Sequence, residues 1–161
     1  MFEYGYTCMK NEEWDLAKYV YSMLLTEDNQ QGSDKMCEQV NLWIALKNLF
    51  GVETIEKEVK ELDVSAMKTQ FSVAKHALLG EFDAVSTLLE GVIDNEIPVW
   101  CVKDWPLFNQ YRESKEYKMF VEKNKELFDT EGYESTNESV GDSEDVITEL
   151  GKDIDITLNI V

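Results

Sequence analysis

The chain has 161 residues, of which 33 are Asp or Glu and 15 are Lys or Arg, giving a formal net charge of -18 at pH 7. This charge opposes unassisted binding to phosphate backbones, so we expect no direct nucleic-acid partner. The length suffices for one domain with a sizeable buried core. Because the sequence contains no signal-type leader and no run of 18 apolar residues, we expect a soluble, cytoplasmic protein without membrane contact.

The first helical hairpin is expected at the start of the chain. Residues 2–9 fit one short helix and residues 14–24 its partner, because apolar side chains recur there every three to four positions. Small Ala17 lies where the two helices would touch. Residues 26–33 are polar and contain Gly32, which favours a loop.

A second pair of helices is expected over residues 34–62. A long helix covers 34–50 and stops before Gly51, and residues 52–62 form its partner. The buried side of this partner carries Val52, Ile55, Val59 and Leu62. Ser65 is the candidate N-cap of the helix that follows.

Residues 69–92 contain the clearest hairpin. Phe71, Ala74 and Leu78 fall on one helical stripe, and the helix is predicted to end at Gly80. Glycine suits a helix end because the left-handed backbone angle often needed there costs it little. The apolar residues of the second helix are Phe82, Val85, Leu88, Leu89 and Val92.

These hairpins resemble tetratricopeptide repeats, which are helical hairpins of about 34 residues with small residues at the contacts and a glycine-containing turn. The residues that match best are Gly5, Trp14, Ala17, Tyr21 and Leu24, followed by Gly80, Phe82 and Leu89. The middle unit departs from the family pattern, since Glu53 stands where an aromatic residue is usual. The resemblance implies an all-α array of hairpins that works through protein contacts.

Residues 104–128 resemble the segment that closes many bacterial tetratricopeptide arrays. The matching residues are Asp104, Pro106, Phe108, Tyr111, Arg112, Ser114, Tyr117 and Phe120. Pro106 suits a first helical turn because it lacks an N–H, and Asp104 could accept from the exposed amides there. Ser114 could cap the last helix. This closing helix would cover the apolar face of the last hairpin.

The composition changes after residue 128, so we expect a helical domain over 1–128 and an acidic linker over 129–144. From residue 129 to the end, 10 residues are acidic and one is basic. Residues 145–161 end in a strand-like segment. Apolar residues alternate there with polar ones, which is the period of a β-strand: Ile154, Ile156, Leu158 and Ile160.

A lone strand has no partner in a helical chain, and three explanations stay open. The segment could be the start of a further domain, a strand that docks onto another protein's sheet edge, or disordered chain. The four apolar residues are therefore candidate protein-binding residues, together with two tryptophans. Trp100 and Trp105 are the tryptophans least explained by core packing, because they flank an unusually apolar connection over residues 98–106.

The sequence offers no catalytic, cofactor-binding or metal-binding residues, and we expect the protein not to be an enzyme. His76 is the single histidine, and no Cys, Ser or carboxylate stands at a persuasive spacing for joint catalysis. Cys8, Cys37 and Cys101 are far apart and form no CxxC motif, so neither a zinc site nor a disulfide framework is indicated.

The predicted function is a non-catalytic protein-interaction module that binds another protein or another domain of the same parent chain. The resemblance implies an adaptor or regulatory part of a bacterial multi-domain or multi-subunit effector, in signalling or antiviral defence. The alternative is a stand-alone acidic inhibitor, such as an immunity protein, an antitoxin or a DNA mimic, which would block a basic site on its target.

Overall fold

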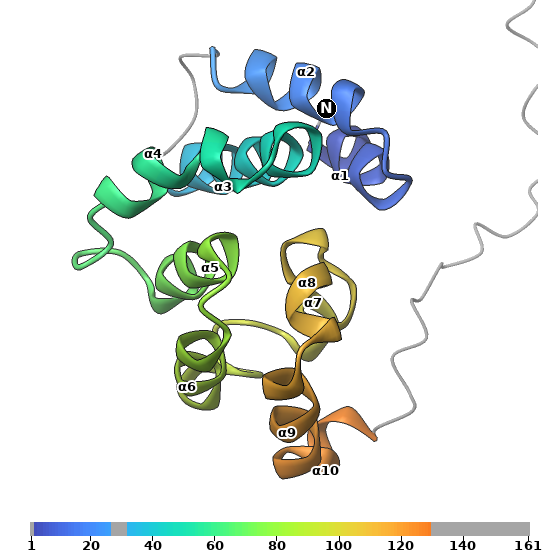
Figure 1. Cartoon of the computed structure of the whole chain (residues 1–161), viewed down its shortest axis with the longest axis vertical. Coiled ribbons are helices and arrows are strands. Elements are labelled where there is room, and N and C mark those ends of the chain that lie inside the picture. The colour runs from blue at the N-terminus through green and yellow to red at the C-terminus, as the bar shows by residue number, and fades with distance from the viewer. Residues whose placement is uncertain (1, 27–31, 130–161) are drawn as a thin grey trace, which may run out of the picture. The chain divides into compact units, whose positions relative to one another are not determined.

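Helices make up the regular secondary structure of the described residues, 2–26 and 32–129 of the computed structural model (Figure 1). Within these residues the only strand-type pairing is an isolated bridge between Ile93 and Ile97. The predicted all-α class is confirmed for this part of the chain. None of the helices described is long and apolar enough to cross a membrane.

Spatial contacts divide the chain into two units, Met1–Asp129 and Thr130–Val161. The second unit lies outside the described residues. It contains nearly all of the predicted acidic linker and the whole of the predicted strand, with Ile154, Ile156, Leu158 and Ile160. The expectations for that segment stay predictions.

The N-terminal hairpin is formed by α1, Phe2–Lys10, and α2, Trp14–Leu24, as the helical spacing predicts. The two helices approach closely, because a Cβ built on Gly5 would lie 2.8 Å from Cζ of the fully buried Tyr21. Ala17 is also fully buried and adds no bulk to this contact. Small residues at these positions therefore set the distance between the helices.

The expected helix over residues 52–62 is divided in two, which corrects the sequence prediction. The α3 helix ends before Gly51, whose φ of 93° breaks the helical backbone, and Ile55 separates a short 3-10 turn from the following helix. Ile55 and Val59 are nevertheless buried as expected. The elements of this segment are α3, Gly32–Phe50, η1, Val52–Thr54, and α4, Glu56–Glu61.

The prediction that Ser65 caps the next helix is wrong. The N–H of Ser65 donates to Asp63 Oδ1 over 2.9 Å within a turn, and the N-cap position is held by Lys68 without a side-chain hydrogen bond. Instead, Lys75 Nζ reaches back to the carbonyl oxygen of Leu62 at 2.7 Å. This contact ties the end of α4 to the next helix.

The central hairpin consists of α5, Thr69–Leu79, and α6, Phe82–Val92, in agreement with the predicted residues 69–92. Gly80 ends α5 in the left-handed conformation, with φ 76° and ψ 19°, which confirms the predicted turn. Phe71, Ala74 and Leu78 are buried.

Residues 98–106 were expected to form a connection, and most of them form a helix instead. Pro98 is the N-cap residue of this helix, and Trp105 follows its last residue. The remaining elements follow at once along the chain. They are α7, Val99–Asp104, η2, Pro106–Phe108, α8, Asn109–Glu113, α9, Lys115–Lys123, and α10, Lys125–Phe128.

The predicted caps of the closing segment are partly confirmed. Pro106 is the first residue of η2, and Ser114 Oγ accepts from the N–H of Tyr117 at 3.1 Å as the cap of α9. The prediction for Asp104 is wrong. Its carboxylate accepts from Lys10 Nζ of α1 at 3.2 Å, so it pairs with a distant helix instead of capping a near one.

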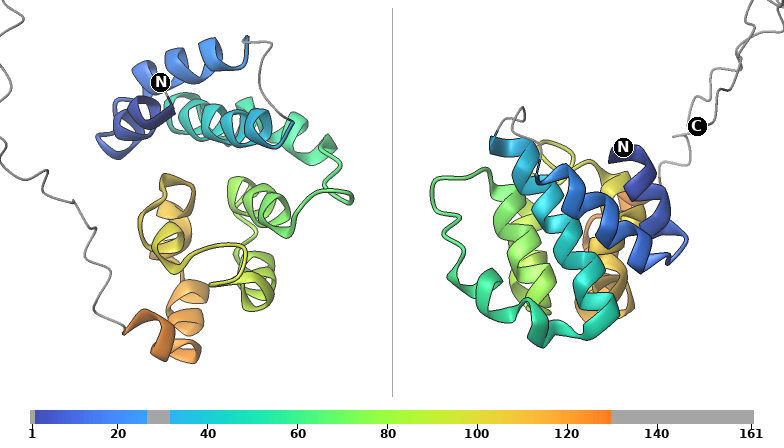
Figure 2. Two further views of the ribbon diagram at one scale, coloured as in Figure 1. Left: turned by 180° about the vertical axis from the view of Figure 1, so that it is seen from behind. Right: turned by 90° about the horizontal axis from the view of Figure 1, so that it is seen from above.

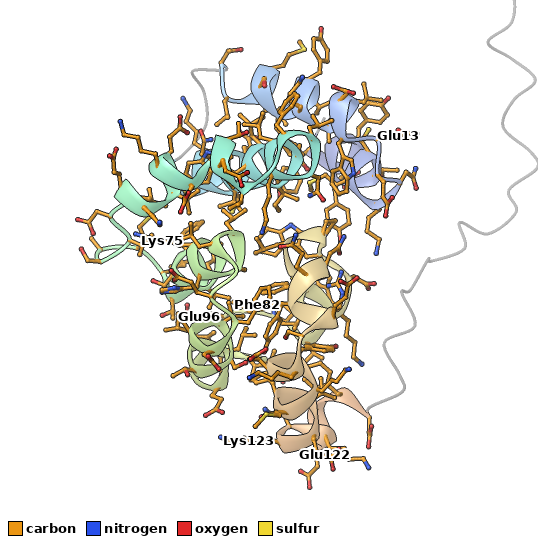
Figure 3. The ribbon with its side chains drawn as sticks, in the orientation of Figure 1. Glu13, Lys75, Phe82, Glu96, Glu122 and Lys123 are labelled. Carbon is orange, nitrogen blue, oxygen red and sulfur yellow. The ribbon has the colours of Figure 1, made fainter. Side chains whose placement is uncertain are left out.

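A series of aromatic rings joins α6 to the last helices. The ring of Tyr111 lies 5.8 Å from Phe82 and 5.4 Å from Tyr117, and Figure 3 shows Phe82 pointing away from α6 toward α8. Tyr111 is fully buried, and its hydroxyl shares a 2.8 Å hydrogen bond with Ser86 Oγ. Tilted and edge-on ring pairs of this kind add to the stabilisation from burial.

Two groups of helices pack beneath α3 in the views of Figures 1 and 2. The first is the α5–α6 hairpin, and the second begins with α7 and η2. Both α5 and η2 contact α3, so α3 is the common wall on which the two groups meet the N-terminal helices.

Replacing Gly80 with alanine should destabilise the protein by about 1 kcal/mol, because the left-handed backbone disfavours a Cβ. No atom lies within 4 Å of the added Cβ, so the effect isolates backbone strain. Gly91→Ala is the matched control, since Gly91 lies within α6 with open space beside it and helical alanine is favoured by up to about 1 kcal/mol. Urea unfolding measures both, and equal effects would refute the turn.

Replacing Gly5 with alanine should destabilise the protein by about 1–3 kcal/mol, because the buried ring of Tyr21 would have to move. The melting temperature should fall in the Gly5→Ala variant and recover in part when Tyr21→Leu is added. A Gly5→Ala variant as stable as the natural chain would show that α1 and α2 are further apart.

Candidate functional site

An apolar pocket of about 480 Å³ lies where α1, α3, α5 and α7 meet. Its wall is mainly apolar and includes Phe2 and Tyr6 of α1, Val40 of α3 and Phe71 of α5. The fourth side is formed by residues 96–98, Trp100, Cys101 and Trp105. A cavity of this size, between helices and with few polar groups, is typical of ligand-binding sites in proteins.

The packing of α3 and α5 explains why the pocket stays open. Val40 and Ala74 are almost fully buried, so the floor belongs to the core, and the small side chain of Ala74 leaves space above it. Phe2 lies at the other extreme, with 45% of its surface exposed. The pocket therefore passes from a rigid floor to an accessible rim.

Trp105 is a fixed part of the wall. Its indole N–H donates to Asn41 Oδ1 of α3 at 3.1 Å, and Asn41 is only 2% exposed. Its ring also packs edge-on against Phe108 at 5.9 Å. Arg112 holds the same region by donating to the carbonyl oxygens of Val102 and Trp105, and burial lowers the pKa of this guanidinium.

Trp100 differs from Trp105 in its exposure and in its hydrogen bonding. Half of its surface is exposed although it lines the pocket, and its indole N–H makes no hydrogen bond with the described residues. An exposed tryptophan beside an apolar cavity offers a large surface and a donor to an incoming group. Of the two predicted tryptophans, Trp100 is the more exposed.

The charges at the pocket are all of one sign. Glu3 and Glu96 line it, and no Lys, Arg or His is part of its described lining. Neither carboxylate forms an ion pair with the residues that the structure describes. The two side chains thus give the rim a negative potential.

The titratable groups near the pocket are poorly suited to nucleophilic chemistry. Burial raises the pKa of the Cys101 thiol to about 11, so this thiol is protonated at neutral pH. His76 is absent from the lining, and its Nδ1 lies 2.5 Å from Glu81 Oε2. Over the described residues, no group of three His, Cys, Asp or Glu side chains is placed to hold a metal ion.

The structure brings together only part of the predicted site. Trp100 and Trp105 lie in one pocket, whereas the four apolar residues of the predicted strand lie outside the described residues. Sequence reasoning missed Phe2, Cys37 and Glu96. Phe2 was taken only as part of the first expected helix, and no local pattern marks the other two.

Comparisons of the chain with models of known protein families, with curated proteins and with solved structures found no match.

The hydrogen bond of Trp105 predicts different effects at the two tryptophans. Trp105→Phe should destabilise the protein by about 1–3 kcal/mol, because it leaves the buried oxygen of Asn41 without its donor. Trp100→Phe makes the same chemical change at an exposed position and should change stability by no more than about 0.5 kcal/mol. Thermal and urea unfolding measure the difference, and equal losses would mean that the bond to Asn41 is unimportant.

Proposed function

We propose that this protein is a non-catalytic interaction module that binds another protein by receiving an apolar side chain in the pocket. The observation that carries the proposal is the combination of half-exposed Trp100 with an apolar cavity of about 480 Å³. Interfaces gain much of their affinity from a bulky apolar or aromatic anchor in such a cavity.

The helical arrangement is compatible with this role and leads to a finer proposal. Under this finer proposal, the hairpins α1–α2 and α5–α6 are units of a tetratricopeptide-like array, and α9 and α10 form its closing element. The chain would then be the adaptor or regulatory part of a bacterial multi-domain or multi-subunit effector, in signalling or antiviral defence. This proposal rests on the sequence resemblance.

A second proposal concerns the end of the chain. The alternation of Ile154, Ile156, Leu158 and Ile160 supports either a docking strand or the start of a further domain. A docking strand would give the protein a second contact with its partner. Two linked contacts raise the apparent affinity when both can form together.

The net charge of -18 favours one alternative function, the blocking of a basic site by an acidic inhibitor. The two functions differ in their response to salt. A charge-steered inhibitor should lose most of its affinity between low and physiological ionic strength through a slower association rate, whereas capture of an apolar anchor should keep most of its affinity because burial supplies it.

The proposal predicts that Trp100→Ala weakens capture of the partner at least 10-fold, as expected for the loss of an interface hot spot. The full chain would be used as bait in a lysate of its source, and the proteins retained would be quantified by mass spectrometry. Tyr19→Ala is the matched control, because Tyr19 is an exposed aromatic residue of α2 that does not line the pocket. Equal retention by the Trp100→Ala variant and the natural chain would contradict a role for the pocket.

A further inference from the structure

We infer that the segment received by the pocket is a peptide in which a bulky apolar residue has Lys or Arg close to it, the cation pairing with Glu3 or with Glu96. This inference rests on the proposed function and specifies the chemistry of the partner. The apolar residue would fill the cavity beside Trp100, and the basic residue would lie at the rim.

The first argument comes from the basic residues of the helices that build the pocket. These helices carry five described lysines; four of them are bound elsewhere, and the fifth, Lys35 of α3, forms no ion pair with Glu3 or Glu96. Lys10 pairs with Asp104, Lys47 donates to the carbonyl of Leu78, Lys75 to that of Leu62, and Lys103 to that of Phe128. A cation from a partner would therefore meet carboxylates that form no ion pair with the described residues.

The second argument comes from the exposed face of Trp100. A guanidinium or ammonium group that approaches the rim can also lie over this indole, and tryptophan is the aromatic side chain that attracts cations best. One basic residue could then use both the ring and one of the carboxylates. The contribution of rim charges falls mainly on the association rate and on its dependence on salt.

Charge also distinguishes this partner from the other possible occupants. Residues 130–161 contain nine acidic residues and one basic residue, and Asp153 and Asp155 flank the first apolar residues of the alternating segment. The rim of Glu3 and Glu96 would repel such a segment. A second copy of the chain would bring a further net charge of -18, which opposes self-association.

The test is selection from a random peptide library displayed on phage, with the full chain as bait at low salt. The enriched peptides should share a bulky apolar residue with Lys or Arg within about one helical turn of sequence. On the Glu3→Gln, Glu96→Gln double variant the basic preference should disappear. A peptide selected on the natural chain should bind this variant roughly 3- to 10-fold more weakly, and the difference should shrink at high salt.

The matched control is Glu122→Gln with Glu126→Gln, which removes the same number of charges from exposed positions in α9 and α10. In Figure 3, Glu122 lies at the opposite end of the ribbon from the helices α1, α2 and α3. The control variant should bind the selected peptide as the natural chain does. An equal loss in both double variants would overturn the inference, because the effect would then come from net charge alone.

The other outcomes separate this inference from the function on which it rests. Apolar peptides selected without a basic preference would overturn the inference and leave an apolar-anchor module standing. Peptides that bind the Trp100→Ala variant equally well, or no enrichment at all, would overturn both. If peptides are enriched only on the Ile154→Asn, Ile156→Asn double variant, the chain's own end fills the pocket and the inference is overturned. If sedimentation shows a dimer, a second copy of the chain is the occupant, and the inference is overturned as well.

Discussion

The hydrogen bond between Trp105 and Asn41 joins α3 to the segment that follows α7. The donor follows α7, the acceptor belongs to α3, and the two residues are 64 positions apart in the sequence. Because the amide of Asn41 is almost fully buried, losing the donor would leave a polar atom unsatisfied in the core. The pair therefore favours one placement of α7 on α3 over alternatives that an apolar contact would tolerate.

The pocket follows from this placement. With Trp105 held against α3, Trp100 of the preceding helix, α7, lies beside the cavity and keeps half of its surface exposed. On the opposite side, the pair between Lys10 and Asp104 joins α1 to the end of α7. The site thus consists of a wall fixed by hydrogen bonds, a half-exposed aromatic side chain and an acidic rim.

The sequence was most informative where a structure depends on neighbouring residues. The α5–α6 hairpin and its turn at Gly80 were predictable because spacing and backbone preference are local properties. The predicted caps at Ser65 and Asp104 were wrong. The N–H of Ser65 donates to Asp63, and the carboxylate of Asp104 accepts from Lys10, which is 94 residues away in the sequence. The apolar segment over residues 98–106 drew attention to Trp100 in the sequence. The pocket beside Trp100 is assembled from four helices, and no local sequence pattern encodes their tertiary placement.

Amide hydrogen exchange of the full chain, alone and with a bound selected peptide, tests the central claim most directly. The account predicts that protection rises in α1 and in residues 96–105, which contain most of the lining after α6, while the outer face of α2 and the α9 helix exchange as before. Protection confined to α2, α9 or the residues beyond 129, with no change at the pocket, would contradict it.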